Sequence, residues 1–211
     1  MIVKIINNHQ RQHNSYDKIK IIFLYLRESI QKTFTNQEVF DLFKSNKLVM
    51  LYLVQLEILI IDKQITDQII TISDKQGGKY LSFFYPEIAK FLNKDQKKEI
   101  EGELKDNMAN FEIKRKIGQD DSIIGKFIRN NSIEDFVNFI AKNNLSLSSK
   151  VKTNSIFETN SFLIKNEPTL IEYAAFNCSV KIFKYLQIKG VELEPKLWIY
   201  AIHGNSIEII H

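Results

Sequence analysis

The stretch that decides the fold is Pro168-Thr-Leu-Ile-Glu-Tyr-Ala-Ala-Phe-Asn-Cys-Ser-Val-Lys-Ile-Phe183, which returns in altered form as Pro195-Lys-Leu-Trp-Ile-Tyr-Ala-Ile-His-Gly-Asn-Ser-Ile-Glu-Ile-Ile210. The offset between the two is 27 residues, and the matching pairs are Pro168/Pro195, Leu170/Leu197, Tyr173/Tyr200, Ala174/Ala201, Ser179/Ser206 and Ile182/Ile209. A fixed offset between similar segments is the signature of a repeat architecture. Each unit predicts a helix, a tight turn and a second helix.

The shared positions have clear physical roles in such a unit. Pro168 and Pro195 suit the first turn of the first helix, where a backbone N–H would have no partner within the helix. Ala174 and Ala201 leave room for another helix to approach closely. We therefore expect both alanines to be buried at equivalent contacts between helices.

A weaker copy of the unit lies upstream, in Ile124–Phe136. Its Ser132 precedes Ser179 by 47 residues. Serine is a favoured N-cap residue, so Ser132, Ser179 and Ser206 are predicted to cap the second helix of each unit.

The segment Leu170–Leu193 resembles an ankyrin repeat. Ala174-Ala175 falls on the paired alanines of that family, Ser179–Leu186 resembles its second helix, and Gly190 resembles its closing glycine. Together with the upstream segment Ile128–Phe136, the sequence Pro168–Ala175 is similar to that of divergent ankyrin proteins, a group greatly expanded in protozoa. In those proteins a helical domain of unknown function precedes more regular repeats.

This resemblance covers about residues 120–211, and residues 1–117 fit the helical leader more loosely. Three features depart from the family's pattern. Cys178 stands where the family usually has glycine at a left-handed turn, which predicts that this turn is either strained or rearranged. Glu172 and Ile199 replace the histidine of the Thr-Pro-Leu-His signature. The offset of 27 residues is shorter than the roughly 33 of ankyrin repeats and indicates a shortened or missing β-finger.

The first half of the chain also has a helical pattern. An early apolar stripe at three- and four-residue spacing consists of Ile19, Ile22, Phe23, Leu26 and Ile30. The motif Thr35-Asn-Gln-Glu38 is a capping box and predicts a helix that begins there. The apolar run Leu48–Ile61 is too short and too polar to cross a bilayer, so it predicts a buried core helix.

Residues 94–117 are highly charged with few apolar positions, which predicts a solvent-facing helix that links two domains. We therefore predict an all-α fold, with a helical N-terminal domain followed by a short ankyrin-like α-solenoid. The domains are residues 1–117, including the charged linker helix 94–117, and residues 118–211, with repeats at 118–150, 165–193 and, incomplete, 194–211.

Composition excludes several classes of protein. The 211 residues include one cysteine, which cannot form an intramolecular disulfide or a zinc site. Seven glycines and three prolines are too few for a sandwich or barrel with frequent turns. The net charge of +4 does not by itself indicate a nucleic-acid partner. The segment Met1–His9 lacks a signal-peptide pattern, so we expect a soluble, cytoplasmic protein.

The residues most able to carry chemistry are better explained structurally. His9 and His13 lack the glutamate of a His-Glu-x-x-His zinc site. Gly77-Gly78-Lys79 lacks the upstream glycine and the hydroxyl of a phosphate-binding loop, and predicts a surface turn. Cys178 is expected to be a small buried hydrophobe. His203 is expected to be solvated at a helix end, where it interacts with the helix dipole.

The acidic residues also fit structural roles. Glu99, Glu101 and Glu103 are spread around a helix rather than gathered at one substrate. Asp120 and Asp121 are expected to cap the helix that follows them.

The basic residues and the tryptophan also fit structural roles. Two basic clusters, Lys94/Lys97/Lys98 and Lys114-Arg-Lys116, are interrupted by acidic side chains and predict a solvated surface rather than a nucleic-acid site. Trp198 aligns with Ile171, which predicts a core position between repeats.

We assign no catalytic, cofactor-binding or metal-binding residues. The predicted function is a non-catalytic protein–protein interaction module or scaffold of ankyrin-repeat type, with a protein partner and neither nucleic acid nor membrane. The alternative is an enzyme or nucleic-acid-binding protein with an unrecognised site in residues 1–117. The repeat and the absence of a catalytic constellation favour the first hypothesis.

The C-terminal end is predicted to be apolar. The last unit stops at His211, about half-way through its second helix, and leaves Ile207 and Ile210 without a covering repeat. Terminal repeats normally need a polar outer face. We expect either a longer native chain or an end that self-associates or binds a partner helix.

Overall fold

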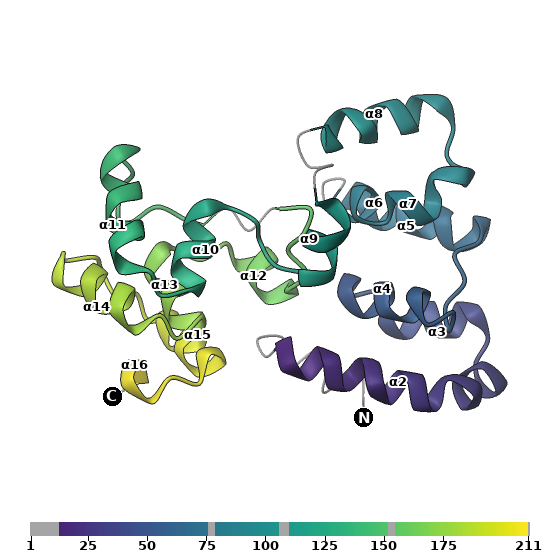
Figure 1. Cartoon of the computed structure of the whole chain (residues 1–211), viewed down its shortest axis with the longest axis horizontal. Coiled ribbons are helices and arrows are strands. Elements are labelled where there is room, and N and C mark those ends of the chain that lie inside the picture. Colours follow the sequence, from purple (N-terminus) through teal and green to yellow (C-terminus); the bar gives the residue numbers. More distant parts are fainter. Residues whose placement is uncertain (1–12, 76–78, 106–109, 152–154, 211) are drawn as a thin grey trace. The chain divides into compact units, whose positions relative to one another are not determined.

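The structure, a computed structural model, describes residues 13–75, 79–105, 110–151 and 155–210 (Figure 1). Every regular element in these residues is a helix. The isolated antiparallel bridge between Lys150 and Thr169 is the sole β contact in this part of the chain. The prediction of an all-α fold is therefore confirmed for the described residues.

Backbone contacts divide the chain into two compact units. Unit 1 comprises the described residues up to Gln119 and the return segment Thr159–Ser161, and unit 2 comprises Asp120–Glu158 and the described residues from Phe162 onward. The return segment joins unit 1 because the Thr159 hydroxyl donates a 2.7 Å hydrogen bond to the Gly118 carbonyl. The boundary predicted after residue 117 lies two residues before the end of the first part of unit 1, and the return segment was not predicted.

Unit 1 consists of short helices joined by tight turns. Their bounds are α2 His13–Thr33, α3 Asn36–Phe43, α4 Lys47–Gln55, α5 Lys63–Lys75, α6 Lys79–Phe83, α7 Tyr85–Ile88, the 3-10 helix η1 Ala89–Phe91, α8 Lys94–Leu104 and α9 Phe111–Ile117.

Helix α4 is the centre of the core of unit 1. Its residues Lys47–Leu53 are buried without interruption, as expected for a helix that is apolar all round. The helix is shorter than the predicted run Leu48–Ile61, because it ends at Gln55 and Glu57 adopts a left-handed φ of 57°. Leu59 and Ile61 remain buried, but in a non-helical segment.

The capping box predicted at Thr35 is confirmed. The Thr35 side chain accepts the Glu38 N–H, and the Glu38 carboxylate accepts the Thr35 N–H at 2.8 Å. The Thr35 N–H and the Thr35 hydroxyl both donate to the Glu38 carboxylate, and these two bonds lower the pKa of Glu38. The apolar stripe on α2 is only half buried, since Ile19 and Phe23 lie in the core whereas Ile22 is exposed.

Two helices, rather than the single linker helix predicted, occupy the described parts of residues 94–117. Helix α9 begins after Asn110, whose φ is 62°, and ends at Gly118, whose φ is 66°. It is not solvent-facing throughout, because Arg115 is buried and donates two 2.7 Å hydrogen bonds to the Glu87 carboxylate. This ion pair ties α9 to α7 and makes the segment part of unit 1.

Unit 2 consists of helix pairs and the single helix α12, whose first residue, Ser161, belongs to unit 1. The bounds are α10 Ile123–Arg129, α11 Ile133–Lys142, α12 Ser161–Asn166, α13 Leu170–Phe176, α14 Val180–Ile188, α15 Leu197–Gly204 and α16 Ile207–Ile210. Helix α13 contacts both α10 and α15, and α14 contacts both α11 and α16 (Figure 1). The first helices of the pairs thus form one layer and the second helices another. Ala174 and Ala201 are buried, as predicted.

The turns inside the pairs share a left-handed residue. The φ angle is 52° at Asn131, 53° at Cys178 and 51° at Asn205, positions that coincide at the offsets of the sequence repeat. Non-glycine residues rarely adopt this conformation. Of the two alternatives expected at Cys178, the structure has the strained left-handed turn and not a rearranged one.

The serines that follow two of these turns do not cap as predicted. Ser132 and Ser179 stand at N-cap positions, but their side chains accept no capping N–H. The Ser179 hydroxyl instead donates to the Ile128 carbonyl. The Asn131 side-chain oxygen accepts two N–H groups at the start of α14, at 3.1 and 3.3 Å. Asn131, in the turn between α10 and α11, thus caps α14. This contact joins the pair α10/α11 to the pair α13/α14.

The prolines lie outside the helices rather than in their first turns. Thr169 is the N-cap of α13 and Lys196 that of α15, so Pro168 and Pro195 precede the caps instead of opening the first turn. The Pro168 carbonyl accepts the Val151 N–H at 2.8 Å, beside the isolated bridge.

Candidate functional site

Helices α13 and α15 differ in how much of their surface is covered. All of α13 is buried, because α10 and α15 both pack against it. On α15, by contrast, the buried residues are Tyr200, Ala201 and Gly204, which lie on one side of the helix. The other side of α15 is the candidate site.

Three large apolar side chains form this exposed side of α15, which we call the α15 face. Trp198, Ile199 and Ile202 are 55%, 49% and 66% exposed, whereas Ile171 and Ala175, which align with Trp198 and Ile202, are 2% and 0% exposed. The prediction that Trp198 is a core residue is therefore wrong. Burial at this position needs a helix on that side, and no described helix covers it.

Helix α15 is held very close to α13. A Cβ placed on Gly204 would lie 2.2 Å from the Ala175 carbonyl oxygen, so this approach requires glycine. The Cys178 thiol donates to the Gly204 carbonyl. Cys178 is thus a half-buried turn residue with a hydrogen-bond partner, rather than the buried hydrophobe predicted.

His203 lies in the last turn of α15 and is exposed. Its ring centroid is 4.4 Å from that of Phe162 and 6.1 Å from that of Phe176. Partial burial lowers the pKa of His203 below 6.5. This shift is opposite in direction to the one that the predicted interaction with the helix dipole would cause, since a helix C-terminus favours the charged imidazolium.

Charged groups lie at the N-terminal end of α15. The Lys196 ammonium is 3.2 Å from Glu194 and 3.4 Å from Glu172, and the pKa of Lys196 is raised, chiefly by its hydrogen bond to Glu194 and also by Glu172. Glu172 is buried, and its carboxylate also accepts the Thr169 N–H at 2.7 Å as part of a capping box. Glu172 therefore stabilises the start of α13 and holds Lys196 near it.

The C-terminal helix α16 is partly uncovered. Ile209 is buried, Ile210 is half-buried and Ile207 is exposed. The Lys184 ammonium lies 3.9 Å from Glu208, which links α14 to α16 at the surface. Ile207, on the helix that follows α15 and contacts it, is therefore a further exposed apolar side chain.

Other residues considered for chemistry are engaged in the fold or lie elsewhere. Lys79 opens α6 and donates to Glu103 at 2.8 Å. Burial opposes ionisation of Glu103, but hydrogen bonds from Lys79 and Ser82 outweigh it and lower the pKa of Glu103. Glu101 accepts the Tyr85 hydroxyl. His9, the His13 side chain, Gly77 and Gly78 lie outside the described part of the structure.

Asp120 and Asp121 do not cap α10 as predicted. The cap is Ser122, whose hydroxyl oxygen accepts an N–H of the first turn at 3.1 Å. Asp120 is buried, which raises its pKa, and accepts the Ser122 hydroxyl. Arg129 donates to the Asp120 carbonyl at 2.6 Å and to the Tyr173 hydroxyl at 2.7 Å. This network fastens α10 to α13.

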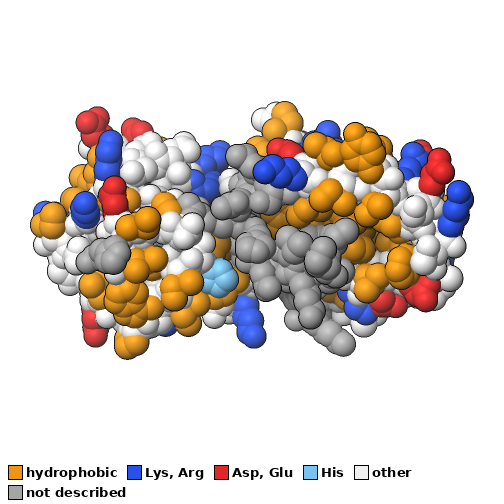
Figure 2. Space-filling view, turned by 90° about the horizontal axis from the view of Figure 1, so that it is seen from below, with side chains coloured by type: hydrophobic (Ala, Val, Ile, Leu, Met, Phe, Trp, Pro, Cys, Tyr) orange, Lys and Arg blue, Asp and Glu red, His pale blue; other side chains and the backbone are white. Residues whose placement is uncertain are grey.

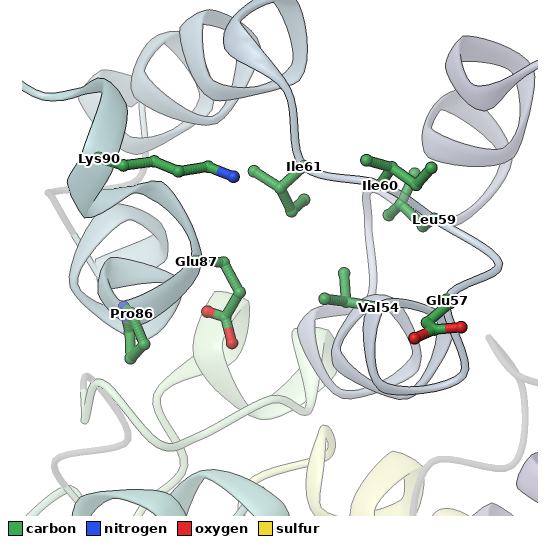
Figure 3. A pocket seen from close by; sticks show the side chains of 8 residues that line it. All are labelled: Val54, Glu57, Leu59, Ile60, Ile61, Pro86, Glu87 and Lys90. Atoms are coloured by element: carbon green, nitrogen blue, oxygen red, sulfur yellow. The ribbon is translucent and has the colours of Figure 1, made fainter.

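Unit 1 contains a cavity of about 370 Å³ (Figure 3). Its lining is mostly apolar and consists of Val54, Glu57, Leu59, Ile60, Ile61, Pro86, Glu87 and Lys90. Both carboxylates are already paired, Glu57 with Arg27 at 2.5 Å and Glu87 with Arg115 at 2.7 Å. The lining holds no serine, cysteine or histidine that could act as a nucleophile or imidazole base.

Among the described residues, no three His, Cys, Asp or Glu side chains gather as metal ligands would. In the same residues, no helix combines the length and apolar composition needed to span a bilayer.

Three contacts in the structure were not predicted from the sequence. The capping box Thr169–Glu172 had a clear signal, since Thr-Leu-Ile-Glu repeats the pattern recognised at Thr35. Asn131 and Arg115 had none, because their partners lie 50 and 28 residues away along the chain.

Comparison of the chain with protein-family models, with curated proteins and with solved structures found no match. The exposed α15 face is therefore the feature of the molecule that bears most directly on its function.

Proposed function

We propose that the chain is a non-catalytic protein-interaction module of ankyrin-repeat type, whose α15 face binds a helix of a partner protein. The observation that carries the proposal is the contrast between equivalent positions, exposed at Trp198 and Ile202 and buried at Ile171 and Ala175. Helix α15 covers that side of α13. A helix is therefore the occupant that a surface of this kind accepts.

The side chains of the α15 face indicate the chemistry of the partner. Contiguous exposed apolar side chains mark interaction sites, and tryptophan is among the residues that contribute most to binding. The fitting partner helix has small residues along its contacting side, as α15 has Ala201 and Gly204 on the side that packs on α13. Charged side chains of the partner, next to these small residues, would then lie opposite Lys196 and Glu194.

The arrangement of unit 2 supports the repeat type. Two helical layers and a left-handed residue in the turns repeat along the chain, and Asn131 caps the second helix of the next pair. Stacked units of this kind build a continuous core through contacts between neighbours. Residues at an end face can then vary with little effect on the other units.

The alternative, an enzyme or nucleic-acid-binding protein with a site in residues 1–117, has less support. The carboxylates of the cavity already hold arginines. In the second basic cluster Arg115 is buried against Glu87, so it does not face a phosphate backbone.

The test captures partners from an extract of the source cells with three forms of the full chain. These are the wild type, the Trp198→Ser/Ile202→Ser variant and the control Ile113→Ser/Ile117→Ser. The control pair is also four residues apart on one helix and is 58% and 48% exposed. It therefore removes a similar apolar surface elsewhere.

A protein retained by the wild type and the control, but lost from the α15 variant, would support the proposal. Capture of the same chain with the same dependence would identify a second copy as the partner, as the sequence analysis also considered. Identical captured proteins for all three forms would contradict the proposal.

A further inference from the structure

Helix α2 has a second apolar side that the rest of the described chain does not cover. Its inner side packs into unit 1, where the ring centroid of Phe23 is 5.4 Å from that of Phe43. On the other side, Ile21, Leu24 and Tyr25 are 53%, 55% and 83% exposed. Figure 2 views unit 1 from the side on which α2 lies, and hydrophobic side chains gather on that face.

The orientation of α2 is fixed by polar contacts along its edge. Arg27 pairs with Glu57 at 2.5 Å, and Gln31 donates to the Glu57 carbonyl at 2.9 Å. Lys20 donates to Gln55 at 3.4 Å. The exposed apolar side is therefore a stable surface of unit 1.

The outermost residues of α2 form a regular stripe, which consists of Lys18, Ile21, Tyr25, Glu28 and Lys32. All five are exposed, and they alternate in spacings of three and four residues, the spacing of a coiled-coil seam. Its apolar centre has a cation on the N-terminal side and an anion on the C-terminal side. Such a stripe is complementary to itself when it runs in the opposite direction.

We propose that α2 pairs antiparallel with α2 of a second copy of this chain, across a twofold axis. Ile21 then packs on Tyr25 of the partner subunit, and Lys18 meets Glu28 of the partner subunit. The twofold symmetry repeats both contacts.

The charges select this direction and register. A parallel pair would place Lys18 beside Lys18 of the partner subunit and Glu28 beside Glu28 of the partner subunit. An antiparallel pair shifted by seven residues would place Ile21 opposite Lys18 or Lys32 of the partner subunit. Like-charge contacts and an isoleucine against an ammonium are both unfavourable.

The charged contacts are accessible but screened by solvent. Glu28 lies 3.6 Å from Lys32 of its own helix, but both side chains are highly exposed, so this pair competes only weakly. A helix of 21 residues is about 30 Å long, and one helix pair buries less than the roughly 800 Å² per partner of a standard interface. We therefore expect a weak dimer that dissociates on dilution and at high salt.

Sedimentation equilibrium of the full chain tests the pairing. Lys18→Glu and Glu28→Lys each place like charges together at both ends of the helix pair, so each is expected to raise the dimer dissociation constant about tenfold or more. The combined variant restores opposite charges and is expected to return to within about threefold of the wild type. Lys63→Glu makes the same change of charge on α5, where Lys63 is exposed, and is expected to have no effect.

Circular dichroism of each variant checks that the fold is intact. A wild type that stays monomeric up to its solubility limit overturns the proposal, and so does a double variant that fails to restore association. A dimer that persists in both single variants but is lost in Trp198→Ser/Ile202→Ser also overturns it, because association would then use the α15 face. The proposal does not depend on the function proposed for unit 2.

Discussion

Replacement of Gly204 by alanine tests the close packing on which the position of the α15 face depends. Gly204 ends α15, and an added Cβ would lie 2.2 Å from the Ala175 carbonyl oxygen and 3.3 Å from that of Phe176. Both neighbours are backbone atoms, which cannot rotate away as a side chain would. The end of α15 must therefore move by about 1 Å to restore a tolerable contact.

The expected cost combines two opposing effects. Overpacking of a close helix contact costs about 1–3 kcal/mol, and a contact this short falls at the upper end. Alanine in place of glycine in a helix returns up to about 1 kcal/mol. The net loss in free energy of unfolding is then about 2 kcal/mol.

Gly102→Ala is the matched control. Gly102 lies inside α8, and an added Cβ would meet nothing within 4 Å. This variant gains helix propensity without a clash, so it is expected to stabilise by about 0.5–1 kcal/mol. The two glycine-to-alanine replacements should therefore change the free energy of unfolding in opposite directions.

Urea unfolding measures both variants. Trp198 is the single tryptophan and lies on the same helix as Gly204, so its fluorescence follows unit 2, while far-UV circular dichroism follows the whole chain. Gly204→Ala should lower the midpoint seen by fluorescence, and Gly102→Ala should not. A Gly204→Ala variant as stable as the wild type would refute the close approach of α13 and α15.

Three further predictions follow from the packing and electrostatics. Arg115→Ala leaves the half-buried Glu87 without its partner and should cost about 3–5 kcal/mol in thermal unfolding, whereas a loss below about 1 kcal/mol would contradict a buried pair. Ala174→Leu should cost about 1–3 kcal/mol because it overpacks a buried helix contact, and a variant that melts like the wild type would refute the repeat register. Since the folded-state pKa of His203 lies below 6.5, the folded chain binds its proton less readily than the unfolded chain. Stability should therefore decrease as the pH falls through 6.5, and His203→Gln should remove that part of the pH dependence.

The features that the sequence predicted correctly depend on local rules or on the repeat. The capping box at Thr35 needs only a hydroxyl and a carboxylate three residues apart. The burial of Ala174 and Ala201 follows from their equivalent places in the repeat. The helical periodicity of the chain likewise predicts the all-α class.

The features that sequence reasoning missed depend on distant neighbours. Trp198 has the register of a core residue but lacks the neighbouring helix that buries Ile171. The sequence pattern around Arg115 predicts a solvated side chain, but Arg115 is buried in an ion pair with Glu87. Ser179 is of a residue type that often caps helices, but its hydroxyl donates to the Ile128 carbonyl and Asn131 accepts the N–H groups of α14 instead.

The most direct test of the account asks whether a partner covers Trp198. Incorporation of 5-fluorotryptophan gives one ¹⁹F NMR signal from this chain, because Trp198 is its single tryptophan. On titration with a protein identified by the capture experiment, the signal should shift and its H₂O/D₂O isotope effect should decrease, since the side chain is 55% exposed in the free chain. A protein that binds the chain and leaves both properties unchanged would contradict the proposed role of the α15 face.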